Sequence, residues 1–257
     1  YGADAVYAGV PKWSLRVRGN GFIREDFIKG IEEAHAMGKK VHAVLNIIPH
    51  VRRVAAFEKV VDEMAQLKPD AFIMADPGLI DIVRNRYPDI PIHLSVQANT
   101  VNAGSVKFWQ KVGLTRCILA RELSLTEIDM IKQECPDMEI EVFAHGALCI
   151  AVSGRCLISG LLSHRDANIG ACNNSCRYGF NIRNVHAATA DDVTTFEADD
   201  GTTLSAQIEE SMHHPGEWMT MEEDLNGSYL MNSKDLCTLP VLKKLIEIGV
   251  DSLKIEG

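Results

Sequence analysis

The sequence predicts an α/β fold, and within that class a TIM-type (β/α) barrel that is incomplete at both ends. Short continuous apolar runs such as "DAFIMAD" at 70–76 alternate with amphipathic stretches such as "VAAFEKVVDEMAQLKP" at 54–69. Continuous apolar strands are typical of a parallel sheet covered on both faces. Glycine or proline stands before several of the runs, as in "MGKK" at 37–40, which is the usual ending of a helix before a strand. No G-x-G-x-x-G follows the first run, which argues against an open dinucleotide-binding sheet.

The expected elements follow this alternation along the chain. Strands are predicted at 4–9, 39–47, 70–76, 92–99, 116–122 and 139–146, and amphipathic helices at 24–38, 54–69 and 103–113. After residue 230 the pattern resumes with a helix at 239–250 and a strand at 251–257. Because the chain opens without methionine and stops inside an apolar strand-like stretch, we expect it to be a piece of a longer protein.

Polar side chains stand at the ends of the predicted strands, where the chemistry of such a barrel lies. A polar group in an apolar strand end is costly unless it is paired or used. The candidates for catalysis are His145, Glu122 and Arg121, and the candidates for substrate binding are Arg16, Arg18, Gln97 and Asn99. Arginine can hold phosphate or a dicarboxylate, amides can read a base edge or a sugar hydroxyl, and histidine can donate a proton. The alternative for each is a pairing that closes the barrel mouth, or plain surface charge.

The alternation breaks at residues 149–184, where four of the seven cysteines lie. Cys117 and Cys135 stand in apolar surroundings and are read as core residues. The other five, namely Cys149, Cys156, Cys172, Cys176 and Cys237, suit zinc or an iron–sulfur cluster, since both take cysteine sulfur. Ligands spread along a loop above a barrel favour a cluster, whereas zinc is normally wrapped by two close pairs. Reactive thiols and plain burial remain the alternatives.

Charge divides the chain into four expected parts: barrel units at 1–148, a cysteine-rich segment at 149–184, an acidic insertion at 185–228 and the last barrel units at 229–257. The cysteine-rich segment carries a local net charge of +3, whereas residues 185–233 contain eleven Asp and Glu and no Lys or Arg. The net charge of −9 therefore comes from one polar stretch, and nucleic acid stays a permitted partner. No run approaches the roughly 20 apolar residues of a membrane span, and we expect a cytoplasmic protein without a membrane partner.

The segments "EVFAHGALCIAVSGRCLIS", "RDANIGACNNSCR", "NSKDLC" and "SLKIEG" together resemble the U32 family, long catalogued as collagenase-like peptidases. Others, such as "HLSVQANTVN" and "FWQKVGLTRCILARELSL", resemble the branch of that family that makes 5-hydroxyuridine at the wobble position of tRNA. The resemblance implies a barrel-like N-terminal region, a further C-terminal domain that this chain lacks, and tRNA as a partner.

The resemblance also implies a cofactor and a small ligand. The cofactor is a [4Fe–4S] cluster on Cys149, Cys156, Cys172 and Cys237, with Cys176 as the other candidate for the fourth position. The ligand is prephenate or a similar small dicarboxylate, and Arg155, Arg165 and Arg177 beside the cysteines could hold it or a phosphate. Hydroxylation of a pyrimidine needs redox capability that side chains lack, so a cofactor has to supply it.

Two other functions compete with tRNA hydroxylation. The first is peptidase activity, although neither H-E-x-x-H nor G-x-S-x-G occurs and His145 with Cys149 imitates a cysteine protease only loosely. The second is a zinc-stabilised RNA-binding scaffold without catalysis.

Overall fold

The computed structural model describes residues 2–15, 24–146, 179–184, 204–211, 215–224, 227–228 and 236–256. The chain divides into two compact units, one comprising Tyr1–Asn173 with Lys234–Gly257 and the other Asn174–Ser233. Each unit is described by itself.

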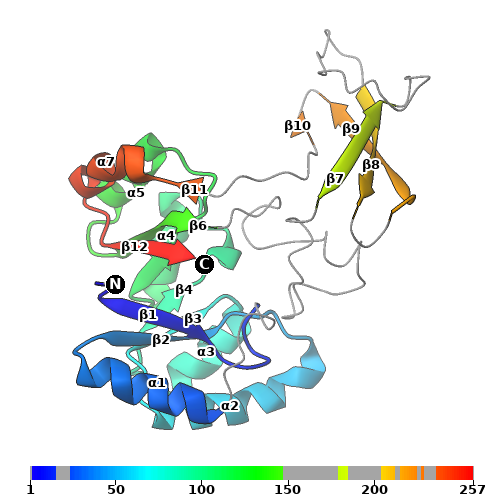
Figure 1. Cartoon of the computed structure of the whole chain (residues 1–257). Helices are drawn as coiled ribbons and strands as arrows, with labels where there is room; N and C mark the ends of the chain where they lie inside the picture. The colour runs from blue at the N-terminus through cyan, green and yellow to red at the C-terminus, as the bar shows by residue number, and fades with distance from the viewer. Residues whose placement is uncertain are drawn as a thin grey trace. The chain divides into compact units, whose positions relative to one another are not determined.

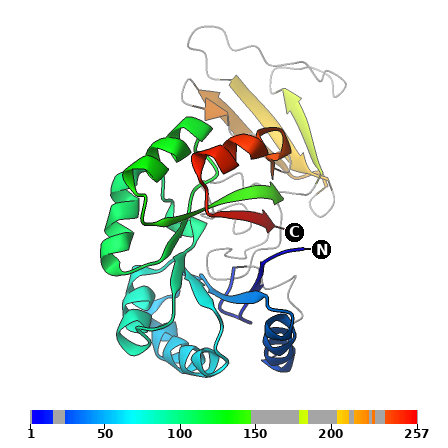
Figure 2. The same ribbon diagram turned by 90° about the vertical axis from the view of Figure 1, so that its left-hand side faces the viewer.

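A curled parallel sheet forms the centre of the first unit (Figures 1 and 2). Six strands pair in the order of the sequence, and a seventh, β12 (Ser252–Glu256), pairs with the sixth. The six are β1 (Ala5–Gly9), β2 (Lys40–Leu45), β3 (Ala71–Met74), β4 (Ile92–Leu94), β5 (Arg116–Ile118) and β6 (Glu139–Gly146). Seven parallel strands curled as a half-barrel confirm the predicted α/β fold and its incomplete TIM-type barrel.

Helices cover the outer face of this sheet, as Figure 2 shows. They are α1 (Arg24–Ala36), α2 (Val54–Gln66), α3 (Pro77–Arg86), α4 (Ala103–Val112), α5 (Leu125–Glu134) and α7 (Leu242–Ile248), with short 3₁₀ turns η1 (Val51–Arg53), η2 (Val96–Ala98) and η5 (Leu239–Val241). Side-chain caps begin several of them. The hydroxyl of Ser124 accepts from the Glu127 amide while the Glu127 carboxylate accepts from the Ser124 amide, so both ends of a capping box are present at α5.

The two faces of the sheet differ in the side chains that they bury. The large apolar core packs the outer face against the helices, with Phe57, Phe72 and Leu94 fully buried. The inner face has a small apolar cluster of Val44, Ile73, Ile118 and Phe143 near the strand ends. The remaining inner positions of β2, β4, β5, β6 and β12 carry polar and charged side chains, which are described below.

Strand β11 (Leu236–Cys237) adds to β6 in the antiparallel sense at the mouth of the half-barrel. On the other side of β6, Gly146 pairs with Glu256 of β12. Gly146 has a φ of 115°, and a Cβ there would stand 1.8 Å from the Glu256 carbonyl oxygen. Only glycine fits this position, because a side chain would collide with backbone.

The two outer strands of the half-barrel, β1 and β12, are linked by one side chain. The Tyr7 hydroxyl donates to the Ile255 carbonyl at 3.3 Å, and the Lys254 ammonium lies 3.9 Å from the centre of the Tyr7 ring. The second unit is a separate four-stranded antiparallel sheet of β7 (Phe180–Asn184), β8 (Leu204–Glu210), β9 (Trp218–Asp224) and β10 (Gly227–Ser228). Within the described ranges, no helix is long and apolar enough to cross a membrane.

Candidate functional site at the barrel mouth

Hydrogen bonds tie the loops after β1, β2 and β4 together at the carboxyl ends of the strands. Asn46 accepts from the Leu15 amide at 3.2 Å and donates from Nδ2 to the Ser95 hydroxyl at 3.2 Å. Ser95 in turn caps η2, where its hydroxyl accepts from the Gln97 amide. Asn46 thus joins the loops on this side of the mouth, because its side-chain carbonyl and its amino group each make a hydrogen bond.

Gln97 follows Ser95 and is 1% exposed. Its side-chain Oε1 and Nε2 have no hydrogen-bond partner anywhere in the described part of the chain, and the same is true of the hydroxyl of Thr100. Between them Asn99 adopts a left-handed φ of 51° and is half-buried. A buried amide with both ends unsatisfied costs stability, so its presence at a strand end is typical of a ligand-binding position.

Replacing Gln97 by methionine is therefore expected to raise the free energy of unfolding by about 1 kcal/mol. An apolar side chain of similar length removes the desolvation penalty of a buried amide that makes no hydrogen bond. Urea denaturation measures it. The matched control is Asn46→Leu, which removes an amide that is fully used and is expected to lower stability by about 1–2 kcal/mol. Equal losses in both variants would contradict this interpretation of Gln97.

Arg121 is held firmly just beyond β5. Its guanidinium forms an ion pair with the Glu256 carboxylate and lies 3.6 Å from the centre of the Phe143 ring. The Arg121 side chain is 5% exposed and that of Glu256 14%. Stacking and pairing fix the plane of the guanidinium, which is the condition for binding a carboxylate or phosphate in bidentate fashion. Its neighbour Glu122 is exposed.

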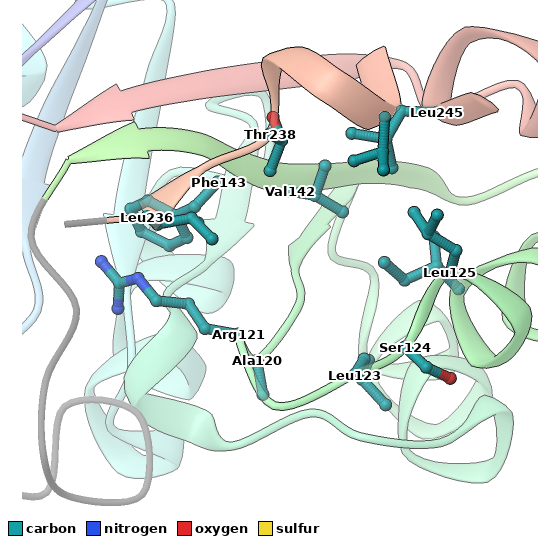
Figure 3. A pocket seen from close by; sticks show the side chains of 12 residues that line it. Ala120, Arg121, Leu123, Ser124, Leu125, Val142, Phe143, Leu236, Thr238 and Leu245 are labelled. Carbon is teal, nitrogen blue, oxygen red and sulfur yellow. The ribbon is translucent and has the colours of Figure 1, made fainter. Parts of the chain in front are cut away.

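A cavity of about 270 Å³ opens beside Arg121, between the end of β6 and the helices α5 and α7. Figure 3 shows the Arg121 side chain extending along its edge toward Phe143 and Leu236. The lining is mostly apolar and comprises Ala120, Arg121, Leu123, Ser124, Leu125, Ile128, Val142, Phe143, Leu236, Thr238, Val241 and Leu245. An apolar hollow with one cation at its edge suits the apolar body of a small anionic ligand.

His145 and Cys237 face each other across the β6–β11 pair, and both are exposed. Cys237 carries a free thiol. The Thr238 amide and hydroxyl both donate to the Ala144 carbonyl at 2.9 Å, which holds this short strand in register. Backbone pairing therefore places a thiol and an imidazole together at the mouth.

The other predicted site residues lie outside the described residues: Arg16, Arg18, Arg155, Arg165, Arg177, Cys149, Cys156, Cys172 and Cys176. Within the described ranges no three metal-ligating side chains gather. Of the predicted residues that are described, the structure places Gln97, Arg121, His145 and Cys237 on neighbouring strand ends, from β4 through β5 and β6 to β11.

A charged network fills the inner face below the mouth. The carboxylate of Glu141 accepts from Arg116 at 2.9 Å, from the Ser252 hydroxyl at 2.8 Å and from Lys254 at 3.2 Å. Burial alone would raise the pKa of Glu141, but Lys254, Ser252 and Arg116 outweigh it and hold this pKa at about 2. Burial lowers the pKa of Lys254, and Glu141 opposes that shift. Both charges persist because each is the counter-ion of the other.

Two buried histidines adjoin this network. The rings of His42 and His93 meet edge to face, with their centres 4.6 Å apart. Burial, followed by the charge of Arg116, lowers the pKa of His42 to about 4 and that of His93 to about 3. Both imidazoles are therefore neutral at pH 7.

Sequence reasoning missed most of this inner face. The predicted site residues did not include Arg116, Glu141, Lys254, His42 or His93. The available signal was the period of two within strands, because Glu139, Glu141 and Phe143 alternate with apolar residues and so point to the same face.

Comparisons with known proteins match this chain along its whole length. The model of peptidase family U32 matches residues 1–257. The chain is 51% identical over 270 residues to the tRNA hydroxylation protein P of Escherichia coli K12, and it aligns in full with 59% of that protein. It is 47% identical over 275 residues to the protein of the same name from Haemophilus influenzae, again with all of this chain and 59% of the relative.

Among solved structures, that of the U32 peptidase Mk0906 is similar with a TM-score of 0.54 at 17% identity, over 69% of this chain and 74% of that one. This likeness supports the half-barrel fold. The chain spans 59% of the length of the two relatives named above.

Proposed function

The chain belongs to the U32 peptidase family, and on that premise we propose that the full-length protein hydroxylates tRNA. The observation that carries the proposal is the 51% identity, along the entire chain, to a tRNA hydroxylation protein. The finer proposal is conversion of the wobble uridine to 5-hydroxyuridine, with prephenate or a similar small dicarboxylate as the associated metabolite.

The geometry supports a base-reading role for Gln97. A carboxamide presents a donor and an acceptor side by side, and the N3–H and O4 of uracil present the complementary pair. Both ends of this amide lack a hydrogen-bond partner within the described residues. A bound base would supply those two hydrogen bonds. Asn99 and Thr100, which follow it, would contact the same nucleotide.

Arg121 would bind the small dicarboxylate. Its guanidinium already has a fixed plane, and the cavity beside it offers apolar walls for the body of such a ligand. An incoming carboxylate would compete with Glu256 for the same guanidinium. His145 and Glu122, on the adjoining strand end and loop, are the groups proposed to hold or donate a proton.

A [4Fe–4S] cluster would supply the electron transfer that oxidation of a pyrimidine ring requires. We propose Cys149, Cys156, Cys172 and Cys237 as its ligands, with Cys176 as the alternative fourth. The donor set fits, since thiolates are the usual ligands of such clusters, and Cys237 is exposed with a free thiol at the mouth. Zinc on the same cysteines is the competing assignment.

The test combines tRNA analysis with metal analysis of the full-length protein. Cells lacking the gene are expected to lose 5-hydroxyuridine from tRNA, as measured by mass spectrometry of nucleosides, and the wild-type gene is expected to restore it. Cys149→Ala, Cys156→Ala and Cys172→Ala are expected not to restore it and to lose the iron and acid-labile sulfide of protein purified without oxygen. Unchanged 5-hydroxyuridine in the deletion strain would overturn the proposed function.

Cys117→Ala and Cys135→Ala are the matched controls, because burial raises the pKa of both thiols, that of Cys117 to about 12, and keeps them protonated. Both are expected to retain iron. Comparison of Cys176→Ala with Cys237→Ala identifies the fourth ligand. A colourless protein with stoichiometric zinc would remove the cluster from the proposal.

A further inference from the structure

The described parts of the loops that follow β1 and β2 carry basic side chains at the barrel mouth. Residues 10–23 and 46–57 contain five Lys and Arg and no Asp or Glu. Of these cations the structure describes Lys12, Arg52 and Arg53, and His50 precedes the two arginines. We call Lys12, His50, Arg52 and Arg53 the basic ridge.

Arg53 joins the two loops. Its Nη2 donates to the Lys12 carbonyl at 2.6 Å, and its guanidinium lies 4.7 Å from the centre of the Trp13 ring. Trp13 is buried and meets Phe57 edge to face at 5.4 Å, so the loops are anchored in the core. Lys12 has a left-handed φ of 67°, an uncommon conformation for lysine that this packing holds in place. The ridge is therefore held in place by packing against the core.

Two other cations belong to the ridge. Lys12 and Arg52 are exposed and, within the described part of the chain, form no ion pair. Several cations on the helices are paired instead, for example Lys107 with Glu134 at 2.6 Å and Arg86 with Glu58 at 2.8 Å. An excess of cations without counter-ions is what a surface for polyanions requires.

The ridge also borders the candidate site. Asn46 stands in the same loop as Arg52 and bonds both Leu15, in the Lys12 loop, and Ser95, which caps Gln97. A nucleotide at Gln97 would therefore have its flanking phosphates within the region of these loops. Val51, between His50 and Arg52, is 84% exposed and adds an apolar contact surface.

We propose that the basic ridge binds the phosphodiester backbone of the tRNA substrate. This inference rests on the proposed function and names the surface that carries it out. Phosphate contacts supply most of the affinity for a nucleic acid and its dependence on salt. Arg53 is already immobilised, so little conformational freedom is lost when it meets a phosphate.

The test is tRNA binding by the full-length protein with Lys12→Glu/Arg52→Glu, measured by filter binding over a range of salt concentrations. Binding is expected to weaken roughly tenfold or more, and the slope of log K against log salt is expected to fall by about one for each lost cation. The matched control is Lys68→Glu/Lys111→Glu. Lys68 is also exposed and left-handed, with a φ of 54°, and both control residues precede strands and so lie at the opposite end of the barrel.

The outcomes separate the two proposals. Wild-type protein that fails to bind tRNA would overturn the proposed function itself. Wild-type binding with equal affinity and salt slope in the ridge and control variants would overturn the ridge alone. Lys12→Gln/Arg52→Gln guards against misfolding by charge reversal, because it removes the same two charges without adding new ones and is expected to show a smaller loss with the same change in slope.

Discussion

Between pH 6.5 and pH 4.5 the half-barrel is expected to lose about 4–5 kcal/mol of stability, because the folded state keeps His42 and His93 neutral whereas the unfolded state lets them bind protons. Their pKa values of about 4 and about 3 lie below the ordinary 6.5. Below pH 6.5 the unfolded chain therefore binds protons that the folded chain does not. Stability is fully present above pH 6.5 and falls as pH decreases toward these folded pKa values, with a slope approaching about 2.7 kcal/mol per pH unit.

Urea denaturation at a series of pH values measures this effect. His42→Gln and His93→Gln are each expected to reduce the slope by about half, since each removes one proton from the difference between the two states. His50→Gln is the control, because His50 is exposed and its replacement should leave the slope unchanged. A wild-type stability that is flat between pH 6.5 and 4.5 would disprove the neutral histidine pair.

Glu141→Gln is expected to lower the free energy of unfolding by about 3–5 kcal/mol, because it leaves the buried Lys254 ammonium without its carboxylate and removes one of the two carboxylates that Arg116 binds. Glu141 is 5% exposed and Lys254 9%, and Arg116 shares the same carboxylate. Water cannot replace the lost charge at this depth. Denaturation at pH 7, where Glu141 is ionised in the wild type, gives the magnitude.

Glu139→Gln is the matched control. Glu139 also binds Arg116, at 2.8 Å, but is 51% exposed, so its removal should cost at most about 1 kcal/mol. The double variant Glu141→Leu/Lys254→Met is expected to recover most of the loss, because it removes both members of the buried pair. A small effect of Glu141→Gln, similar to that of Glu139→Gln, would mean that the network is hydrated.

The fold could be predicted from sequence because its signals are local. Apolar runs such as 70–76 and helix endings such as Gly113 are visible within a few residues, and a parallel half-barrel follows from their alternation. The strand-end candidates Gln97, Arg121 and His145 could be found in the same way, since polar groups that end apolar runs stand out.

The partners of these residues could not be predicted, because they depend on strand register. Arg121 pairs with Glu256, which is 135 residues away, and Glu141 with Lys254 at a separation of 113. Nothing local to Arg121 indicates which carboxylate it meets. The lack of hydrogen-bond partners for the Gln97 amide, within the described residues, likewise depends on its surroundings. The convergence of Cys149, Cys156 and Cys172 remains a prediction.

At the level of the gene, the codon for Gly146 tolerates almost no change of amino acid. Every glycine codon changes its amino acid when either of its first two bases is altered, and any side chain at 146 meets the Glu256 backbone oxygen. Such a missense change would push β12 away from β6 and pull the Glu256 carboxylate from Arg121. Missense substitutions at this codon are therefore expected to be selected against, whereas silent third-base substitutions are not.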